Sequence, residues 1–168
     1  MRTSDAGIRM LKHHEGVRRR PYLCPAFLHT VGVGHLLYPE QVALPAVRTP
    51  ENVGKPLRKE YPLRPEDNRV WTDAEVDDLL AQDLVRFERG VARLCPAAVA
   101  RQSHFDAIVS FAFNVGLGNL QRSSVRMRYN RGDVEGAAEG LLMWTKGGGR
   151  VLPGLVKRRN DERKLLLT

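Results

Sequence analysis

The sequence predicts an α+β fold that is mainly helical, with a small sheet-containing N-terminal lobe, a long connecting helix and a helical C-terminal lobe. Three observations support this fold class. Glycine alternates with valine from Val31 to Gly34 as in a strand, a capping box opens a helix at Thr72, and the apolar residues after it recur at helical spacing. We expect a single domain of 168 residues with a ligand cleft between the two lobes.

The N-terminal part of the chain is predicted to hold one helix and a small sheet. The helix spans about residues 5–14, with Thr3 or Ser4 as its cap and Gly16 as its stop. The small lobe covers about 16–71, and its strands fall between Tyr22 and His35. Residues 39–70 form a proline-rich insertion, which we call the excursion, and proline favours irregular structure there.

The rest of the chain is predicted to be helical. The connecting helix spans about residues 73–93, and the helical lobe spans about 96–168, with the N-terminal helix 5–14 packed on it. Ser103 is expected to cap a core helix over 105–113, followed by a turn at 114–118. Shorter helices follow at 124–129 and 134–144, then a glycine loop at 147–149, and Pro153 opens a basic last helix.

The charge balance predicts a polyanionic partner. Lysine and arginine total 27 against 19 acidic residues, a net charge of +8, which favours nucleic acid, an anionic membrane or an acidic cell wall. No zinc finger, aromatic RNA-binding signature or helix-turn-helix pattern is present, so we do not expect nucleic acid. Two cysteines and five scattered histidines give neither a disulfide framework nor metal-ligand spacing, so no metal and no cofactor are expected.

Glu15 is the first candidate for chemistry. It stands at the end of the first predicted helix, where unsatisfied carbonyls disfavour a negative charge. A carboxyl group kept protonated is what a general acid needs, although a glutamate in this position is often simply exposed. Cys24 and Thr30, taken singly, read as a small apolar residue and a strand former.

The spacing of these three residues resembles that of the phage-type lysozymes, glycoside hydrolase family twenty-four. That family carries Glu, then Asp or Cys after eight intervening residues, then Thr after five more, and the same intervals separate Glu15, Cys24 and Thr30. The resemblance extends over nearly the whole chain except residues 39–70. It is carried by the segments 30–37, 80–84, 110–116, 148–149, 152–155 and 158–159 and by Trp144.

The resemblance implies a lysozyme-like fold and an endolysin that hydrolyses the β-1,4 bond between N-acetylmuramic acid and N-acetylglucosamine in peptidoglycan, causing host cell lysis. It implies that Glu15 protonates the leaving oxygen while Cys24 and Thr30 lie on the opposite face of the sugar. Many members have Asp at the position of Cys24. A thiol is mostly protonated at pH 7, so the sequence leaves open whether Cys24 positions a water or attacks directly, and with it the inverting or retaining outcome.

Further positions match family residues with supporting roles. His35 and Asp83 match a structural ion pair. Leu36, Phe113 and Ser124 match positions that touch saccharide, and Asn114 and Trp144 are expected to line or support the floor of the cleft.

The N-terminal residues lack an apolar run, which predicts synthesis in the host cytoplasm without a signal peptide or signal anchor. The enzyme would then depend on a holin and act in the periplasm on the cell wall. We expect a monomer whose partner is peptidoglycan. Its basic surface and C-terminal helix suggest a second partner, an anionic outer membrane or lipopolysaccharide.

Other functions stay open from the sequence. A lytic transglycosylase would cleave the same bond and leave an anhydro sugar, and a cationic membrane-permeabilising protein would act through the basic helix after Pro153. A zinc amidase lacks its ligand spacing, and a non-enzymatic relative does not fit the presence of Glu15, Cys24 and Thr30 together. The excursion carries six basic residues, Arg48, Lys55, Arg58, Lys59, Arg64 and Arg69. They suggest that the excursion contacts the wall or shields the cleft, and the alternative is that it is a tolerated surface insertion.

Overall fold

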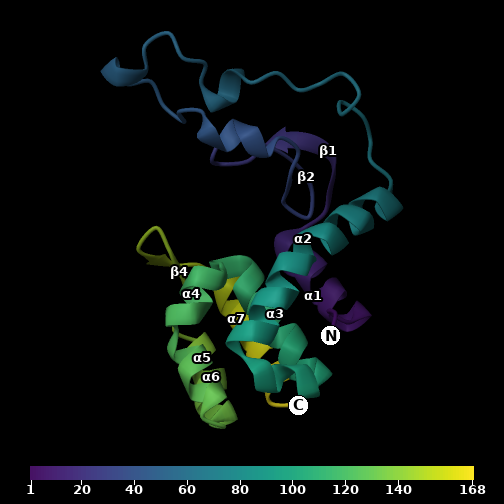
Figure 1. The fold of residues 1–168 in the computed structure, drawn as a ribbon, viewed down its shortest axis with the longest axis vertical. Coiled ribbons are helices and arrows are strands. Elements are labelled where there is room, and N and C mark those ends of the chain that lie inside the picture. Colours follow the sequence, from purple (N-terminus) through teal and green to yellow (C-terminus); the bar gives the residue numbers. More distant parts are fainter. The chain divides into compact units, whose positions relative to one another are not determined.

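The computed structural model describes residues 1–168 and has a mainly helical α+β fold (Figure 1). The chain divides into a larger unit, Met1–His14 with Leu84–Thr168, and a smaller unit, Glu15–Asp83. The helices are α1 (Asp5–Glu15), α2 (Asp73–Leu94), α3 (Gln102–Val115), α4 (Leu117–Arg122), α5 (Ser124–Asn130), α6 (Val134–Leu141) and α7 (Pro153–Leu166). The strands are β1 (Arg18–Leu23), β2 (His29–Gly32), β3 (His35–Leu36), β4 (Lys146–Gly147) and β5 (Arg150–Val151).

The smaller unit is built on a three-stranded antiparallel sheet in the order β1-β2-β3. Val31 of β2 is buried, and so is Val33, but Val33 and Gly34 form the turn between β2 and β3 and do not continue the strand that the sequence suggested. The Thr72 capping box opens α2: the Glu75 amide donates to the Thr72 hydroxyl, and the Glu75 carboxylate accepts from the Thr72 amide. Val76, one turn into α2, lies against Gly32 of β2.

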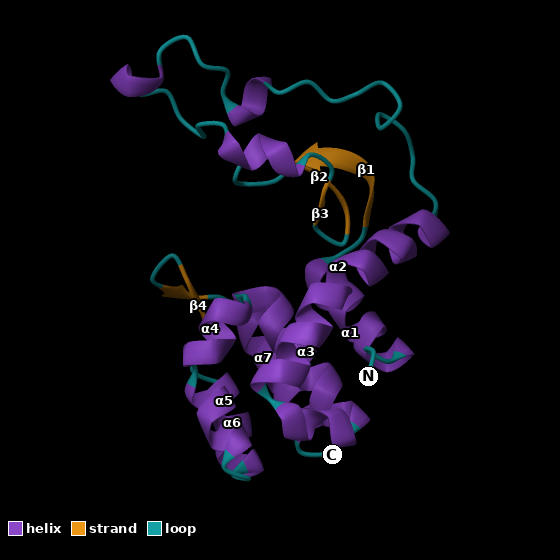
Figure 2. Cartoon of the chain, viewed as in Figure 1, coloured by secondary structure: helices purple, strands orange, loops and turns teal.

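The excursion contains three short 3₁₀ helices that the sequence did not predict, at Pro39–Ala43, Pro50–Asn52 and Arg58–Glu60 (Figure 2). Proline starts the first two, since the missing amide proton costs nothing in a first helical turn. Tyr38 and Leu57 are buried beneath them. The excursion is therefore irregular in path, but it has its own small core.

The larger unit is centred on α3, in which every residue from His104 to Ala112 is buried. This helix packs against α7, and α6 packs against both α5 and α7. Both cysteines are free thiols, and burial raises the pKa of Cys95 to about 11. None of the helices has the length and apolar composition that crossing a bilayer would require.

Several sequence predictions in the larger unit are wrong in detail. The turn predicted at 114–118 is reduced to Gly116, because α3 runs to Val115 and α4 begins at Leu117, and the helix predicted over 134–144 ends at Leu141. Ser103 does not cap α3, because the helix already begins at Gln102 and Arg101 occupies the cap position without a side-chain bond. The glycine loop at 147–149 is the turn of a small hairpin between β4 and β5. Gly148 and Gly149 both have positive φ, which a tight two-residue hairpin turn requires.

Candidate active site

The hairpin between β1 and β2 carries two of the three candidate catalytic residues. Tyr22 stands opposite Thr30, and Leu23 stands opposite His29. The chain then turns: the Cys24 carbonyl accepts a hydrogen bond from the Phe27 amide at 2.8 Å, and the Cys24 amide donates to the Leu28 carbonyl at 3.0 Å. Cys24 is thus fixed by its backbone at the mouth of the turn, with a free, half-buried thiol.

Thr30 is bound to the same carbonyl group as Cys24. Its hydroxyl donates to the Leu28 carbonyl at 3.0 Å, and its side chain is almost fully buried. One peptide oxygen therefore holds both the amide of Cys24 and the hydroxyl of Thr30. Because the hydroxyl proton points at Leu28, the lone pairs of Thr30 Oγ1 are left to accept a hydrogen bond.

Glu15 is the last residue of α1 and the first residue of the smaller unit. Gly16 follows with φ 75°, a left-handed conformation that ends the helix and lets the chain enter β1. The C-terminal end of a helix presents unpaired carbonyls, so the carboxyl group of Glu15 lies in a locally negative field.

Glu15 and Cys24 both act electrostatically on the Tyr22 hydroxyl. Burial raises the pKa of Tyr22; the Arg18 cation opposes this, and Cys24 and Glu15 each add to it. The Arg18 guanidinium lies 4.3 Å from the centroid of the Tyr22 ring. Nothing in the sequence singles out Tyr22, because its position opposite Thr30 depends on the register of β1 and β2.

His35 and Asp83 lie in contact. His35 Nδ1 is 3.0 Å from Asp83 Oδ2, and both side chains are partly exposed. A carboxylate can only accept, so Nδ1 carries the proton in this contact. The pair ties β3 to α2 within the smaller unit. Leu36, the next residue of β3, stands opposite Thr30.

Three of the candidate saccharide-contacting residues in the larger unit are associated with α3. Phe113 packs on Phe87 with ring centroids 5.0 Å apart, and Trp144 meets the Phe111 ring edge-on at 5.4 Å. Asn114 Oδ1 accepts a hydrogen bond from Arg159 Nη2 at 2.9 Å. The fourth candidate, Ser124, is the first residue of α5, and the capping side chain there is that of its neighbour Ser123.

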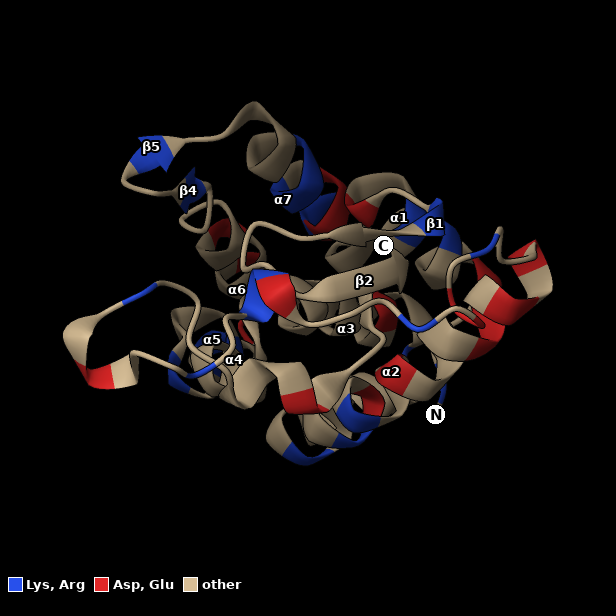
Figure 3. Ribbon diagram, turned by 90° about the horizontal axis from the view of Figure 1, so that it is seen from above, with Lys and Arg blue, Asp and Glu red and all other residues tan.

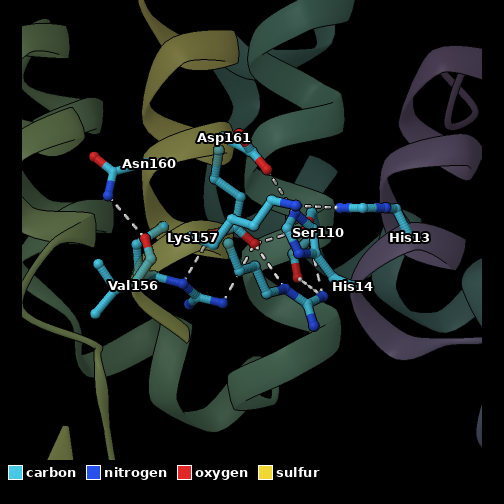
Figure 4. Close-up of polar contacts among 10 residues, drawn as sticks. His13, His14, Ser110, Val156, Lys157, Asn160 and Asp161 are labelled. Atoms are coloured by element: carbon cyan, nitrogen blue, oxygen red, sulfur yellow. Dashed lines mark hydrogen bonds and ion pairs between the residues drawn. The ribbon is translucent and has the colours of Figure 1, made fainter. Parts of the chain in front are cut away.

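The last turn of α1, which leads into Glu15, is joined to α7 by two side-chain contacts (Figure 4). His13 Nε2 lies 2.9 Å from Lys157 Nζ, and His14 Nε2 lies 3.1 Å from Asp161 Oδ2. Burial lowers the pKa of His14, and the positive charge of Arg158 lowers it further, against the effect of Asp161. His14 therefore favours its neutral form at this junction.

The basic last helix does not present all of its cations to solvent, contrary to what the sequence suggested. Figure 3 marks lysine and arginine along α7, but Arg158 and Arg159 are buried against the carboxylate of Glu162. Arg163 pairs with Glu139 of α6. The physical reason is that α7 packs on α3 and α6, and the face that carries Arg158, Arg159, Glu162 and Leu166 is buried there.

No group of three or more His, Cys, Asp or Glu side chains that could hold a metal ion is found among residues 1–168.

Comparisons with known proteins show the family of the chain. Residues 12–162 match the family model described as phage lysozyme. An endolysin of Bacillus phage B103 is 37% identical over 170 residues, which are 100% of this chain and 55% of that protein. A SAR-endolysin of Bacteriophage PS119 is 30% identical over 153 residues, which are 91% of this chain and 76% of that protein. The chain therefore spans about half the length of the Bacillus phage relative and three quarters of the other.

Two solved structures extend the likeness to the fold. The muramidase domain of SpmX from Asticaccaulis excentricus is 28% identical, with a TM-score of 0.74 and coverage of 99% of this chain and 98% of that chain. A P22 lysozyme mutant is 27% identical, with a TM-score of 0.74 and coverage of 100% and 99%.

Proposed function

Because the chain belongs to the phage lysozyme family, we propose that it is an endolysin with muramidase activity that hydrolyses peptidoglycan. The substrate bond is the β-1,4 linkage between N-acetylmuramic acid and N-acetylglucosamine. The observation that carries this proposal is the hairpin in which Cys24 and Thr30 share the Leu28 carbonyl, in the same unit as Glu15. The muramidase domain at a TM-score of 0.74 supports the same reaction class.

In the proposed reaction, Glu15 is the general acid. Its carboxyl group gives a proton to the glycosidic oxygen as the bond from that oxygen to C1 of N-acetylmuramic acid breaks. A water molecule adds to C1 and releases a proton to solvent, and Glu15 regains a proton from solvent. One bond is thus exchanged for another, with water as the only co-reactant.

The proposed role of Thr30 is to orient that water. Its hydroxyl proton is directed to the Leu28 carbonyl, so its oxygen accepts a hydrogen bond from the water and turns a lone pair of the water toward C1. The Cys24 thiol is a second group on that face. Direct attack by its thiolate, with a covalent glycosyl intermediate and a retained anomeric centre, is the alternative for this residue.

Leu36, Phe113, Asn114, Ser124 and Trp144 are proposed to contact or support the glycan. His35 and Asp83 are proposed to hold β3 on α2 without touching substrate. We propose the periplasm as the place of action, since the peptidoglycan of a Gram-negative host lies there. Holin dependence, a monomeric state and binding to an anionic outer membrane stay predictions.

The proposal is tested by digesting purified Gram-negative peptidoglycan with the wild type and with Glu15→Gln and reading the product masses. We expect soluble fragments ending in N-acetylmuramic acid from the wild type and a loss of about a hundredfold or more in rate for Glu15→Gln, since the acid is removed. Glu66→Gln, at an exposed position of the same unit, is the matched control and should keep wild-type activity.

Two results would redirect the assignment. Anhydro-muramic ends from the wild type would mean a lytic transglycosylase. Lysis of permeabilised cells by both proteins, without released saccharide, would mean a membrane-active protein.

A further inference from the structure

One buried side chain of the excursion reaches back to the candidate catalytic hairpin. Gln41 is 0% exposed, although it lies in a proline-rich segment. Its carboxamide makes three backbone contacts. Oε1 accepts from the His29 amide at 2.9 Å, and Nε2 donates to the carbonyls of Phe27 at 2.9 Å and Arg58 at 2.7 Å. Both amide hydrogens and the amide oxygen of Gln41 are therefore in use.

The bonds to Phe27 and His29 enclose Leu28, whose carbonyl holds Cys24 and Thr30. Gln41 therefore hydrogen-bonds the backbone on both sides of Leu28, the residue whose carbonyl positions Cys24 and Thr30. Phe27 has φ 59°, the one positive value outside glycine in this chain. A bulky residue in this region is strained and persists only where the surroundings impose it. The hydrogen bond from Gln41 Nε2 to the Phe27 carbonyl helps to hold Phe27 in this conformation.

The third bond of Gln41, to the Arg58 carbonyl, connects the hairpin to the 3₁₀ helix Arg58–Glu60 of the excursion. Arg58 in turn donates from its side chain to the carbonyls of Leu44 and Val42, and its amide donates to Pro45. The excursion is closed on itself around Gln41. It contacts the hairpin through that side chain and through the Tyr61 carbonyl, which lies 2.9 Å from His29 Nε2.

The cations of the excursion also serve internal contacts. Arg48 donates to the carbonyls of Asn52 and Lys55, Arg64 pairs with Glu40, and Arg69 pairs with Glu75. Together with Arg58, these are four of the six basic residues that suggested contact with the wall. Their use inside the unit favours a supporting role for the excursion over recognition of an anionic polymer.

We infer that Gln41 is a positioning residue for the hydrolytic site, and that the excursion braces the turn bearing Cys24 and Thr30. This inference rests on the proposed function of that site. Without the Gln41 carboxamide, the Phe27–His29 backbone would lose two buried hydrogen-bond partners, and the Leu28 carbonyl between them would be held less firmly.

The test uses Gln41→Leu, which keeps the approximate size and removes all three bonds, and Gln41→Glu, which keeps the acceptor for His29 and removes both donors. Amide hydrogen exchange reports on the turn without any need for activity. We expect the His29 and Cys24 amides to exchange about tenfold faster in Gln41→Leu. On peptidoglycan we expect kcat to fall by about tenfold to a hundredfold with KM nearly unchanged.

Asn52→Ala is the matched control. The Asn52 carboxamide also bonds backbone, accepting from the Thr49 amide and donating to the Val47 carbonyl, but at the far end of the excursion. We expect wild-type exchange at His29 and Cys24 and wild-type kcat. If Gln41→Leu does not fold, Gln41→Glu carries the test, with faster exchange expected at Cys24 and a lower kcat.

Three results would overturn the inference. These are unchanged exchange at both amides in a folded Gln41 variant, unchanged kcat despite faster exchange, and an equal loss in Asn52→Ala. A wild type that releases no saccharide contradicts the proposed function instead, and the exchange rates still decide whether Gln41 braces the turn.

Discussion

At the scale of single residues, the direction of the Thr30 hydroxyl decides what this side chain can do. A threonine in a strand is often only a β-branched packing residue. Here the hydroxyl donates to Leu28, the side chain is 2% exposed, and the acceptor also holds Cys24. A structural role and a water-orienting role for Thr30 predict different effects of removing its hydroxyl. The loss of stability is small if the Leu28 carbonyl keeps its other donor, so a large loss of activity would indicate the water-orienting role.

We predict that Thr30→Val lowers kcat about a hundredfold. The free energy of unfolding should fall by only about 1 kcal/mol, since the Cys24 amide still satisfies Leu28. Thr30→Ser, which keeps the hydroxyl, should retain most of the activity. Steady-state kinetics on peptidoglycan and urea unfolding measure the two effects. Full activity in Thr30→Val would show that the hydroxyl has no part in the reaction.

At the scale of elements, a buried ionic cluster joins α7 to α3. The Glu162 carboxylate accepts from Ser110 Oγ at 2.7 Å and from Arg158 Nε at 3.1 Å, and Arg159 Nε lies 3.1 Å from its second oxygen. Arg159 continues the network to Asn114. The cluster therefore connects the core of the larger unit to one of the candidate glycan-contacting residues.

We predict that Glu162→Gln destabilises the protein by about 3–5 kcal/mol, because it leaves two buried guanidinium groups without their carboxylate. Glu139→Gln, which breaks the ion pair between α6 and α7, is the control. The pair is partly exposed to water, with the Arg163 side chain 37% and the Glu139 side chain 55% exposed, so the loss there should be about 0–1 kcal/mol. Denaturant unfolding of both variants measures the difference, and equal losses would mean that the buried cluster contributes no more than a surface pair.

Elements with local signals were predictable, and contacts over long sequence distances were not. The start of α2 follows from Thr72 and Glu75, which are three residues apart and bond each other. The partners of Gln41 lie 12, 14 and 17 residues away, and nothing near Gln41 indicates its burial. Gly148 and Gly149 fit a loop as well as a hairpin turn, so β4 and β5 were missed.

The candidate site was reached from the sequence by the joint spacing of Glu15, Cys24 and Thr30. Each of these residue types has an ordinary structural explanation when taken alone. The hydrogen bonds that join two of them at Leu28 depend on the register of β1 and β2, which spacing does not specify. The burial of Arg158 and Arg159 likewise depends on contacts with residues distant in the sequence, whereas their own segment has the composition of a basic surface.

At the scale of the whole molecule, the charge and the division into units bear on how the chain meets its substrate. The net charge of +8 favours association with polyanionic cell-envelope surfaces. Two of the 27 cations are nevertheless buried with Glu162, and several in the excursion are engaged within the smaller unit. The three proposed catalytic residues all belong to that unit, whereas most of the proposed glycan contacts belong to the larger one.

The central claim is that Glu15 drives addition of water to C1 of N-acetylmuramic acid. The most direct measurement is a digest of purified peptidoglycan in water enriched in heavy oxygen, read by mass spectrometry for the wild type and Glu15→Gln. We expect one heavy oxygen at each new reducing end from the wild type and almost no product from Glu15→Gln. Unlabelled anhydro ends, or labelled products from Glu15→Gln at the wild-type rate, would contradict it.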